Sequence, residues 1–446
     1  MTSSREPGGT LRARDALALT VGIVIGAGIF RAPAAVAAAA GSAEAMLAAW
    51  AAGGLLSILG ALCYAELAAA FPHSGGDYHF LERAFGGRIA FFHAWARLSV
   101  IQTGSLALLA YVVGDYLNLV APLGRAGPAW WAAATVVLVS GVNWAGVRLG
   151  AGVQRWLTIV EVAGLVALIA AGFAVAPAAA PALPAPVGET NIGLALVFVL
   201  LTYGGWSETA YLSAELGAAR RRIAAVLVGG LGLVTALYLL ANLAFLRALG
   251  FAGLQGAEAV GAAVMERALG PAGAAAISLA VAIAALTSAN ATAITGARGA
   301  AALGANLKGG GWLARWDVAR GTPGNAVLVQ AAVALALVTA GAFSRDGFAL
   351  AVDYTAPVFW LFLSAVGVAF FMLRRREPNA PRPFRVPLYP VVPALFLGTS
   401  AFMLWSSLAY AGRGALVGVA VLAAGALLLP LVRQEVRADP NPTRSG

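Results

Sequence analysis

The chain has 446 residues, of which 61% are hydrophobic and 11% are charged, and its formal net charge is +10. Soluble globular proteins average about 45–50% apolar and about 25% charged residues, so this composition excludes a cytosolic, secreted or nuclear protein. The single cysteine, Cys63, excludes a scaffold built on disulfides.

Twelve apolar stretches are long enough to cross a membrane as helices, because a span needs about 20 mostly apolar residues. In chain order we predict spans at residues 16–40, 44–70, 88–120, 129–147, 151–176, 191–216, 222–249, 271–303, 325–342, 348–373, 389–410 and 413–432. The first stretch is too long for a cleavable signal peptide and is expected to remain as an uncleaved anchor.

Basic residues predict the orientation, since lysine and arginine concentrate in cytoplasmic segments. If both termini are cytoplasmic, the inner segments hold most of the 29 Lys and Arg residues, and the outer segments hold only Arg125, Arg247, Arg267, Arg345 and Arg413. We therefore expect a multi-pass protein of the plasma or inner membrane with both termini in the cytoplasm. The expected organisation is a tail at 1–15, a five-helix block at 16–176, a second five-helix block at 191–373, two additional helices at 389–432 and a tail at 433–446.

Two predicted spans carry backbone-breaking sequence in the middle. Span 1 contains Gly26 and Gly28, and span 6 contains Gly204 and Gly205. Glycine is costly inside a helix and favours departures from helical geometry. Each break falls in the first span of a five-span block, and an odd number of spans per block inverts the second block relative to the first. Paired interruptions at matching places in two halves predict a transporter binding site.

A broken helix offers groups that suit a zwitterion. Unwinding at mid-membrane frees N–H and C=O groups, which are tolerated only where they line a cavity or bind something. Free N–H groups at the start of a half-helix attract a carboxylate, and freed carbonyls accept hydrogen bonds from an ammonium group. The alternative is that the glycines only let helices pack closely, but the matched break in span 6 favours a binding site.

Five groups of residues resemble motifs of the amino acid–polyamine–organocation superfamily, in its branch of L-type amino acid transporters and bacterial amino acid permeases. They are Gly26-Ala27-Gly28-Ile29-Phe30; Tyr64-Ala65-Glu66-Leu67 followed by Pro72-His73-Ser74-Gly75-Gly76-Asp77-Tyr78; Tyr203-Gly204-Gly205-Trp206; Ser288-Ala289-Asn290 with Arg298; and Pro383-Phe384-Arg385-Val386-Pro387. The resemblance keeps motif order and spacing along nearly the whole chain. It implies an all-α integral membrane fold of the LeuT type, with two inverted five-helix repeats, two additional helices, and discontinuous spans 1 and 6.

The resemblance also implies amino acid transport by alternating access. The backbone of residues 25–29 would hold the substrate carboxylate, and that of residues 203–205 its ammonium group. Trp206 would pack over the bound side chain as part of a gate. The implied substrate-binding residues are Ile25, Gly26, Ala27, Gly28, Ile29, Tyr203, Gly204, Gly205 and Trp206.

The coupling group departs from the family pattern. Related carriers usually have a lysine in span 5, and aligning Gln154 and Thr158 with that segment places Glu161 at the position of the lysine. A carboxylate there could bind a proton, or help hold a sodium ion with polar groups of span 8 such as Ser288; a structural hydrogen bond is the alternative. We expect a proton-coupled symporter of neutral amino acids without a further cofactor. The alternatives are an exchanger, or a transporter of cationic amino acids or polyamines.

Other polar side chains within spans are candidates because an ionisable group in a membrane is costly and normally faces the bundle interior. Glu208 follows the span 6 break, where it either opposes the half-helix dipole or contacts a polar or cationic substrate. Gln102 and Thr103 of span 3 are candidate contacts of the substrate or the gate. Arg31 and Arg97 are expected to snorkel or to pair with acids.

Partners and rival functions follow from what the sequence contains. Cys63 lies within span 2, so no outer cysteine suits a disulfide with a glycoprotein heavy chain, and we expect a single-subunit carrier whose partners are an amino acid and the bilayer. Nucleic acid and metal are not expected.

A channel would need rings of charge or carbonyls around an open axis. Acid, base and metal groups within the spans are too sparse for an enzyme, and no G-x-x-x-x-G-K-[ST] loop indicates a nucleotide-driven pump.

Overall fold

The computed structural model describes residues 21–22, 24–73, 75–146, 151–178, 190–208, 223–344, 346–410 and 413–432. Within these ranges the protein is helical, and the only strand-like pairings are two isolated bridges. The all-helical class expected from the composition is therefore confirmed. The predicted tails at 1–15 and 433–446 lie outside the described residues.

The α-helices are, in chain order, α2 (Ala32–Ala40), α3 (Ala43–Ala70), α4 (Asp77–Phe85), α5 (Gly87–Ala96), α6 (Gln102–Val120), α7 (Gly127–Trp144), α8 (Ala151–Ala174), α9 (Ile192–Thr202), α10 (Ile223–Gln255), α11 (Val260–Ala305), α12 (Gly324–Ala342), α13 (Gly347–Arg376), α14 (Val391–Tyr410) and α15 (Arg413–Ala424). A π-helical turn at Arg97–Ile101 joins α5 to α6, and 3-10 turns lie at Ala27–Phe30, Gly310–Trp312 and Gly425–Leu431. Glycines 250 and 270 kink α10 and α11 where a short surface segment connects them.

Eight helical segments of the described chain are long and apolar enough to cross a membrane. They match eight of the twelve predicted spans. The other four predictions, at 16–40, 129–147, 151–176 and 191–216, contain helices that are shorter, less apolar or partly outside the described ranges. The number of twelve spans therefore stays a prediction.

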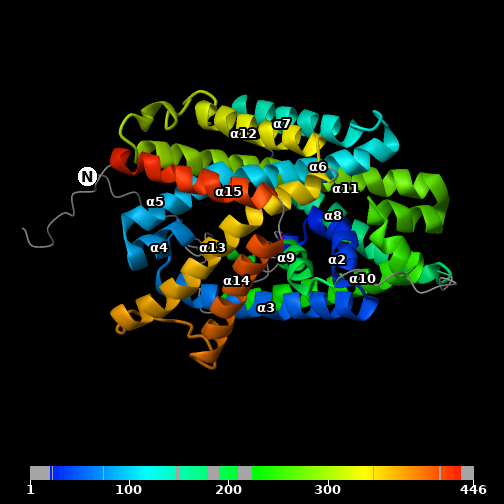
Figure 1. Cartoon of the computed structure of the whole chain (residues 1–446), viewed down its shortest axis with the longest axis horizontal. Coiled ribbons are helices and arrows are strands. Elements are labelled where there is room, and N and C mark those ends of the chain that lie inside the picture. The colour runs from blue at the N-terminus through cyan, green and yellow to red at the C-terminus, as the bar shows by residue number, and fades with distance from the viewer. Residues whose placement is uncertain are drawn as a thin grey trace, which may run out of the picture.

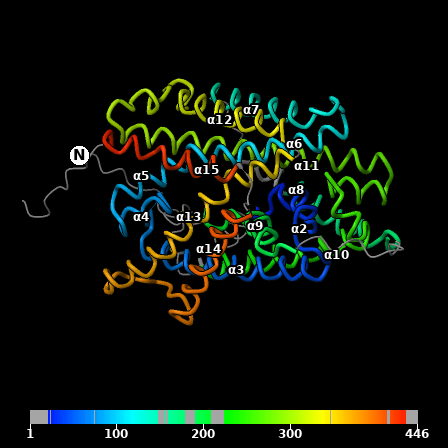
Figure 2. Tube along the Cα trace, in the orientation of Figure 1, coloured from blue at the N-terminus to red at the C-terminus, as the bar shows by residue number. Residues whose placement is uncertain are grey.

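The long helices lie in layers, as Figure 1 shows. Helices α7 and α12 pack side by side along one edge, next to α6 and α11, and α3 and α10 pack side by side along the opposite edge. The short helices α2 and α9 lie between these layers, and the trace in Figure 2 shows the same order. The chain around the two expected breaks thus lies inside the bundle, where Ile25, Ile29 and Tyr203 belong to one continuous buried apolar cluster.

Helix α3 approaches its neighbours through glycines that leave no room for a side chain. A Cβ atom on Gly53 would collide with Val199 of α9, and one on Gly54 would collide with Thr235 of α10. A Cβ atom on Gly60 would lie 2.6 Å from the Trp206 ring. Small residues at such contacts are the usual basis of tight helix packing in membranes, so α3 is held closely against both α9 and α10.

Candidate functional site

The backbone of span 1 leaves helical geometry at the predicted glycines. Helical residues end at Val24, and Gly26 is extended, with φ −121° and ψ 175°. The 3-10 turn Ala27–Phe30 follows, and α2 begins only at Ala32. Amide groups at the start of a helical turn have no acceptor within that turn, so the N–H groups of Ala27 and Gly28 stand where an anion would find donors.

The backbone of span 6 breaks at the second predicted place. Helix α9 ends at Thr202, and Tyr203–Gly205 form a turn in which Gly205 has φ +97°, a conformation that favours glycine. A short 3-10 turn over residues 206–208 follows, and residues 209–222 are outside the described chain.

The two breaks touch each other. A Cβ atom on Gly28 would lie 3.2 Å from Cγ2 of Thr202, the last residue of α9. Beside Gly26 the arrangement differs, because a Cβ atom there would meet no atom within 4 Å. The first break therefore presents open space at Gly26 and a tight contact with span 6 two residues later.

Three tyrosine hydroxyls fix backbone carbonyls at or near the breaks, and the sequence analysis did not single out two of these residues, Tyr116 and Tyr238. The Tyr238 hydroxyl donates to the carbonyl of Val24 at 2.9 Å, just before the break, and the Tyr116 hydroxyl donates to the carbonyl of Phe30 at 2.8 Å, just after it. The Tyr203 hydroxyl donates to the carbonyl of Trp50 at 3.1 Å. No sequence pattern marks Tyr116 and Tyr238, and the motif of Tyr203 does not reveal its contact with Trp50, because each hydroxyl acts on a backbone group far away along the chain.

Trp206 lies in a cluster of aromatic rings beside the second break. Its side chain is 6% exposed. Its ring centroid lies 5.2 Å from that of Tyr64 at an interplanar angle of 89°, and 6.4 Å from that of Phe396 at 74°. Edge-to-face pairs of this kind contribute about 0.5–1.5 kcal/mol each beyond the area they bury. These ring contacts therefore stabilise the observed position of Trp206.

A narrow cavity adjoins this aromatic cluster. Its volume is about 20 Å³, and its lining includes Gly204, Gly205, Ser57 of α3 and Trp360 of α13. Such a volume has room for about one water molecule. An amino acid can enter only if helices or the Trp206 side chain move.

The polar candidates of spans 3, 5 and 8 are not gathered at this cavity. Gln102 and Thr103 are buried on α6, and the Thr103 hydroxyl donates to the carbonyl of Ser99 within its own helix at 2.9 Å. Glu161 on α8 is 8% exposed, and its Oε1 atom has no hydrogen-bond partner among the described residues. Ser288 on α11 is half-buried.

Two buried polar atoms near α8 were missed from the sequence. Helix α8 packs against α10 and α11. Asn242 on α10 and Ser278 on α11 are fully buried, and the Asn242 Oδ1 and Ser278 Oγ atoms lack hydrogen-bond partners in the described part of the chain. Together with Glu161 they place three polar groups with unsatisfied atoms on three mutually packed helices.

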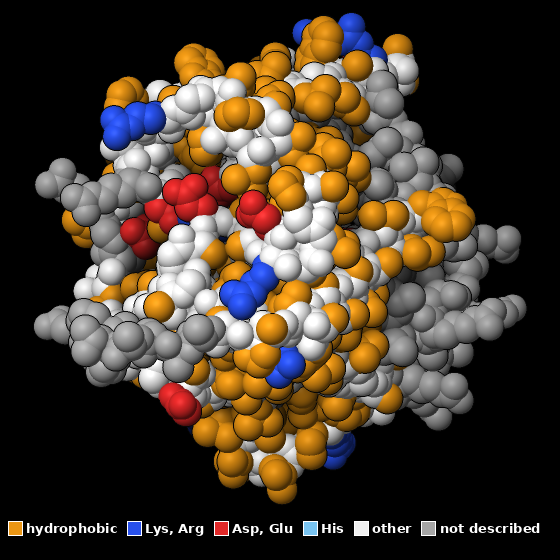
Figure 3. Space-filling view, turned by 90° about the vertical axis from the view of Figure 1, so that its right-hand side faces the viewer, with side chains coloured by type: hydrophobic (Ala, Val, Ile, Leu, Met, Phe, Trp, Pro, Cys, Tyr) orange, Lys and Arg blue, Asp and Glu red, His pale blue; other side chains and the backbone are white. Residues whose placement is uncertain are grey.

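One end of the bundle carries acidic side chains, and we call it the acidic end (Asp115, Glu258 and Asp346). Figure 3 looks onto this end and shows acidic side chains gathered there. Arg31, just after the first break, donates to Asp115 at 3.1 Å and to Asp346 at 2.7 Å. The prediction that Arg31 pairs with acids is confirmed. The pair ties span 1 to α6 and to the start of α13.

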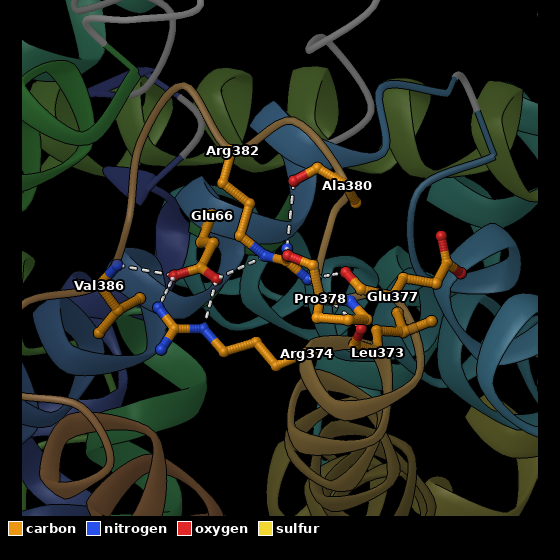
Figure 4. Close-up of polar contacts among 8 residues, drawn as sticks. All are labelled: Glu66, Leu373, Arg374, Glu377, Pro378, Ala380, Arg382 and Val386. Atoms are coloured by element: carbon orange, nitrogen blue, oxygen red, sulfur yellow. Dashed lines mark hydrogen bonds and ion pairs between the residues drawn. The ribbon is translucent and has the colours of Figure 1, made fainter.

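The opposite end is the basic end (Arg83, Arg88, Lys308 and 374–376). Here Glu66 of α3 is 1% exposed and accepts hydrogen bonds from Arg374 Nε and Nη2, each at 2.7 Å, as Figure 4 shows. The Arg382 Nε atom lies 3.3 Å from Glu66 Oε1, and the Val386 amide donates to Oε2 at 2.7 Å. This carboxylate therefore joins α3 to the end of α13 and to the loop that follows it.

Glu208 has a partner as well. Its Oε1 atom lies 3.5 Å from Arg97 Nη1, in the π-helical turn of span 3. The acid that directly follows the second break is thus held by a cation from the neighbouring helix. The partner of Arg97, which the sequence left unnamed, is identified.

Comparison with known proteins shows the family to which the chain belongs. A sequence profile of the amino acid permease family matches residues 11–428. The chain belongs to the amino acid permease family. The permease is 30% identical over 402 residues to the b(0,+)-type amino acid transporter 1 of Mus musculus, covering 87% of this chain and 80% of the relative. It is 29% identical over 429 residues to the large neutral amino acids transporter small subunit 2 of Homo sapiens, covering 92% and 78%.

The resemblance to the amino acid–polyamine–organocation superfamily is thereby confirmed. The family and these relatives are transporters of amino acids rather than enzymes. Together with the eight apolar helices, they identify this permease as a multi-pass membrane protein.

Proposed function

We propose that the permease carries an amino acid across the membrane by alternating access, with the substrate bound at the two helix breaks. The observation that carries this proposal is the contact between the breaks, where Gly28 meets Thr202 while Gly26 faces open space. Amides of residues 25–29 would receive the carboxylate, and carbonyls of residues 203–205 the ammonium group. The Trp206 side chain would move out of its aromatic cluster to admit the substrate side chain.

The proposed architecture has twelve spans in two inverted five-helix repeats followed by two helices. The basic end would face the cytoplasm, since arginine and lysine mark cytoplasmic segments, and both termini would lie there, with the protein in the plasma or inner membrane. The Arg31 pairs with Asp115 and Asp346 would close the outer side. The Glu66 cluster would stabilise the inner side.

The test of this function is uptake by proteoliposomes that contain the purified permease alone. Labelled neutral amino acids, lysine and putrescine are offered separately, either under an inward proton gradient or with unlabelled amino acid trapped inside. Accumulation of a neutral amino acid under the gradient in otherwise empty vesicles supports proton-coupled symport. Flux only against trapped amino acid establishes the exchanger, and uptake of lysine or putrescine alone establishes the cationic alternative.

Proton coupling is proposed to run through Glu161, and Glu161→Gln tests it. The Oε1 atom of this buried side chain has no hydrogen-bond partner among the described residues, so it could bind and release a proton, and the amide would imitate the protonated carboxyl group. We expect gradient-driven accumulation to disappear while counterflow without a gradient persists. Glu266→Gln, the same change at an exposed acid of α11, is the control, and it is expected to leave accumulation intact. Undiminished accumulation by Glu161→Gln would remove it as the coupling group.

The Arg31 pairs predict how the outer side opens. Arg31→Gln leaves Asp115 and Asp346 facing each other without a cation, which destabilises the closed arrangement. The buried Ile29, changed to cysteine in a Cys63→Ala background, reports access from that side. We expect a membrane-impermeant thiol reagent to modify it about tenfold faster, the equivalent of ~1.4 kcal/mol lost by the closed form. Equal rates with and without Arg31→Gln would contradict the gate.

The permease is proposed to act without a heavy chain. Cys63 is fully buried in α3, so no described cysteine can reach a partner outside the bundle. The relative named a small subunit raises the question of a second subunit. Transport by the purified chain alone answers it, and activity that appears only after another subunit is added would refute this part of the proposal.

A further inference from the structure

The Tyr116 hydroxyl joins three parts of the chain at the acidic end. Tyr116 on α6 is fully buried, and its hydroxyl donates to the carbonyl of Phe30 at 2.8 Å. The same hydroxyl accepts a hydrogen bond from the amide of Gly261 at 3.1 Å. Phe30 ends the 3-10 turn of span 1, and Gly261 lies in the first turn of α11. A single oxygen atom therefore connects span 1, α6 and α11.

The first turn of α11 depends on an acceptor from another helix. The first amides of a helix have no acceptor within that helix, and a side chain at the N-cap position commonly supplies one. The N-cap residue of α11 is Ala259, which makes no side-chain cap hydrogen bond. The Tyr116 hydroxyl accepts from the Gly261 amide instead, so α6 caps α11.

Gly261 is packed closely against this hydroxyl. A Cβ atom on Gly261 would lie 3.1 Å from the Tyr116 hydroxyl oxygen. It would also lie 3.3 Å from Cδ1 of Leu168 on α8 and 3.6 Å from Cδ1 of Phe30. The first two distances are shorter than ordinary van der Waals contacts, so a larger residue at position 261 must displace the hydroxyl or its neighbours.

The two hydrogen bonds of Tyr116 form a chain with one direction. The Gly261 amide donates to the hydroxyl, and the hydroxyl donates to the Phe30 carbonyl. Hydrogen bonds in such a chain polarise and strengthen one another, so the start of α11 strengthens the attachment of span 1 to α6. The next residue on each side, Arg31 and Asp115, forms the ion pair described above. Span 1 is thus attached to α6 by a charged contact and a neutral contact side by side.

We propose that Tyr116 is a positioning residue of the outer gate, which holds the outer half of span 1 (residues 27–40) in the closed arrangement through Phe30. This inference rests on the proposed transport function. When the outer half of span 1 moves away from α6 to admit a substrate, the bond to Phe30 must break. The bond to Gly261 joins α6 to α11 and can persist in both arrangements. The bond to Phe30 therefore stabilises the closed form relative to the open form.

Tyr116→Phe tests this inference, because it removes the hydroxyl and keeps the ring. Ile29→Cys in a Cys63→Ala background is the reporter, and a membrane-impermeant thiol reagent is supplied from the acidic end alone or from the basic end alone. We expect modification from the acidic end to become about three- to tenfold faster, the effect of one net hydrogen bond. Modification from the basic end should be no faster. General loosening of the fold would raise both rates, so the difference between the two ends separates a role in the gate from a role in stability.

Tyr111→Phe is the matched control. Tyr111 lies on the same helix, is 4% exposed, and donates from its hydroxyl to the carbonyl of Val338 on α12 at 2.6 Å. This variant also loses one buried hydrogen bond, but the lost bond joins α6 to α12, and neither helix carries one of the two breaks. It is expected to keep the wild-type rates from both ends.

Gly261→Ala is a second variant, in which the added methyl group crowds the Tyr116 hydroxyl. It is expected to raise the rate from the acidic end in the same way. A wild-type rate in Tyr116→Phe, an equal rise from both ends, or the same rise in Tyr111→Phe overturns the role of Tyr116 and leaves the transport function standing. If Tyr116→Phe does not fold, a wild-type rate in Gly261→Ala overturns that role. Absence of counterflow by the wild-type permease in proteoliposomes overturns the transport function itself, and the gate with it.

Discussion

Glu66→Gln is expected to cause a large loss of stability. The wild-type carboxylate is 1% exposed and faces the guanidinium groups of Arg374 and Arg382. The amide cannot compensate these charges, and removal of one partner from a buried ion pair costs about 3–5 kcal/mol. Thermal unfolding of the purified permease in detergent should show a clear fall in the melting temperature. The variant should also bind substrate less tightly if the inner end loosens.

Glu377→Gln provides a matched control for this prediction. Glu377 accepts two hydrogen bonds from Arg83 at 2.6 Å each, at the same end of the molecule, but the Glu377 side chain is 28% exposed and that of Arg83 is 42% exposed. Exposed pairs contribute about 0–1 kcal/mol. The Glu377 variant should therefore unfold close to the wild-type temperature, although both changes remove a carboxylate that holds an arginine through two bonds. Equal shifts for Glu66→Gln and Glu377→Gln would show that burial does not set the strength of the Glu66 cluster.

Gly26→Leu is expected to abolish substrate binding while leaving the fold intact. A Cβ atom on Gly26 would meet no atom within 4 Å, and Gly26 lies in the first break, so a leucine side chain would occupy space beside the proposed site. At Gly204 the same substitution would press against the carbonyl of Leu201 at 2.8 Å, so loss of binding there could reflect strain. Gly26 is the cleaner position. Binding is measured by the rise in melting temperature that a saturating amino acid produces.

Gly232→Leu is the corresponding control. This glycine lies on the exposed face of α10 and also has no atom within 4 Å of a built Cβ. The same residue change in equally open surroundings, away from the breaks, should leave the substrate-induced shift unchanged. A normal shift in Gly26→Leu would place the substrate somewhere else in the bundle.

The positions of the breaks could be predicted because their cause is local. Glycine lowers the stability of a helix through its own backbone freedom, and Gly26, Gly204 and Gly205 lie where the structure leaves helical geometry. The all-helical class followed from composition in the same way. The predicted roles of these residues in holding a substrate stay predictions.

Partners across the bundle could not be predicted because they depend on the folded arrangement. Arg31 reaches Asp115 and Asp346, which are 84 and 315 residues away in the sequence. A polar residue within a span can also be misjudged as a site residue. Thr103 was a candidate contact of the substrate or the gate, but its hydroxyl donates to a carbonyl of its own helix. Hydrophobic periodicity gives little help here, because helices that are apolar all round have no distinct core face.

The close packing of α3 has a mechanical consequence. At Gly60 this helix rests against the Trp206 ring, and at Glu66 it holds Arg374. The two points are six residues apart, or about 9 Å along a straight α-helix. A helix is stiff over that length, so any displacement of Trp206 that pushes on Gly60 reaches Glu66 as a strain on its hydrogen bonds. Helix α3 would then transmit a displacement from Gly60 to Glu66. The size of a bound side chain would thereby affect the hydrogen bonds of Glu66 at the basic end.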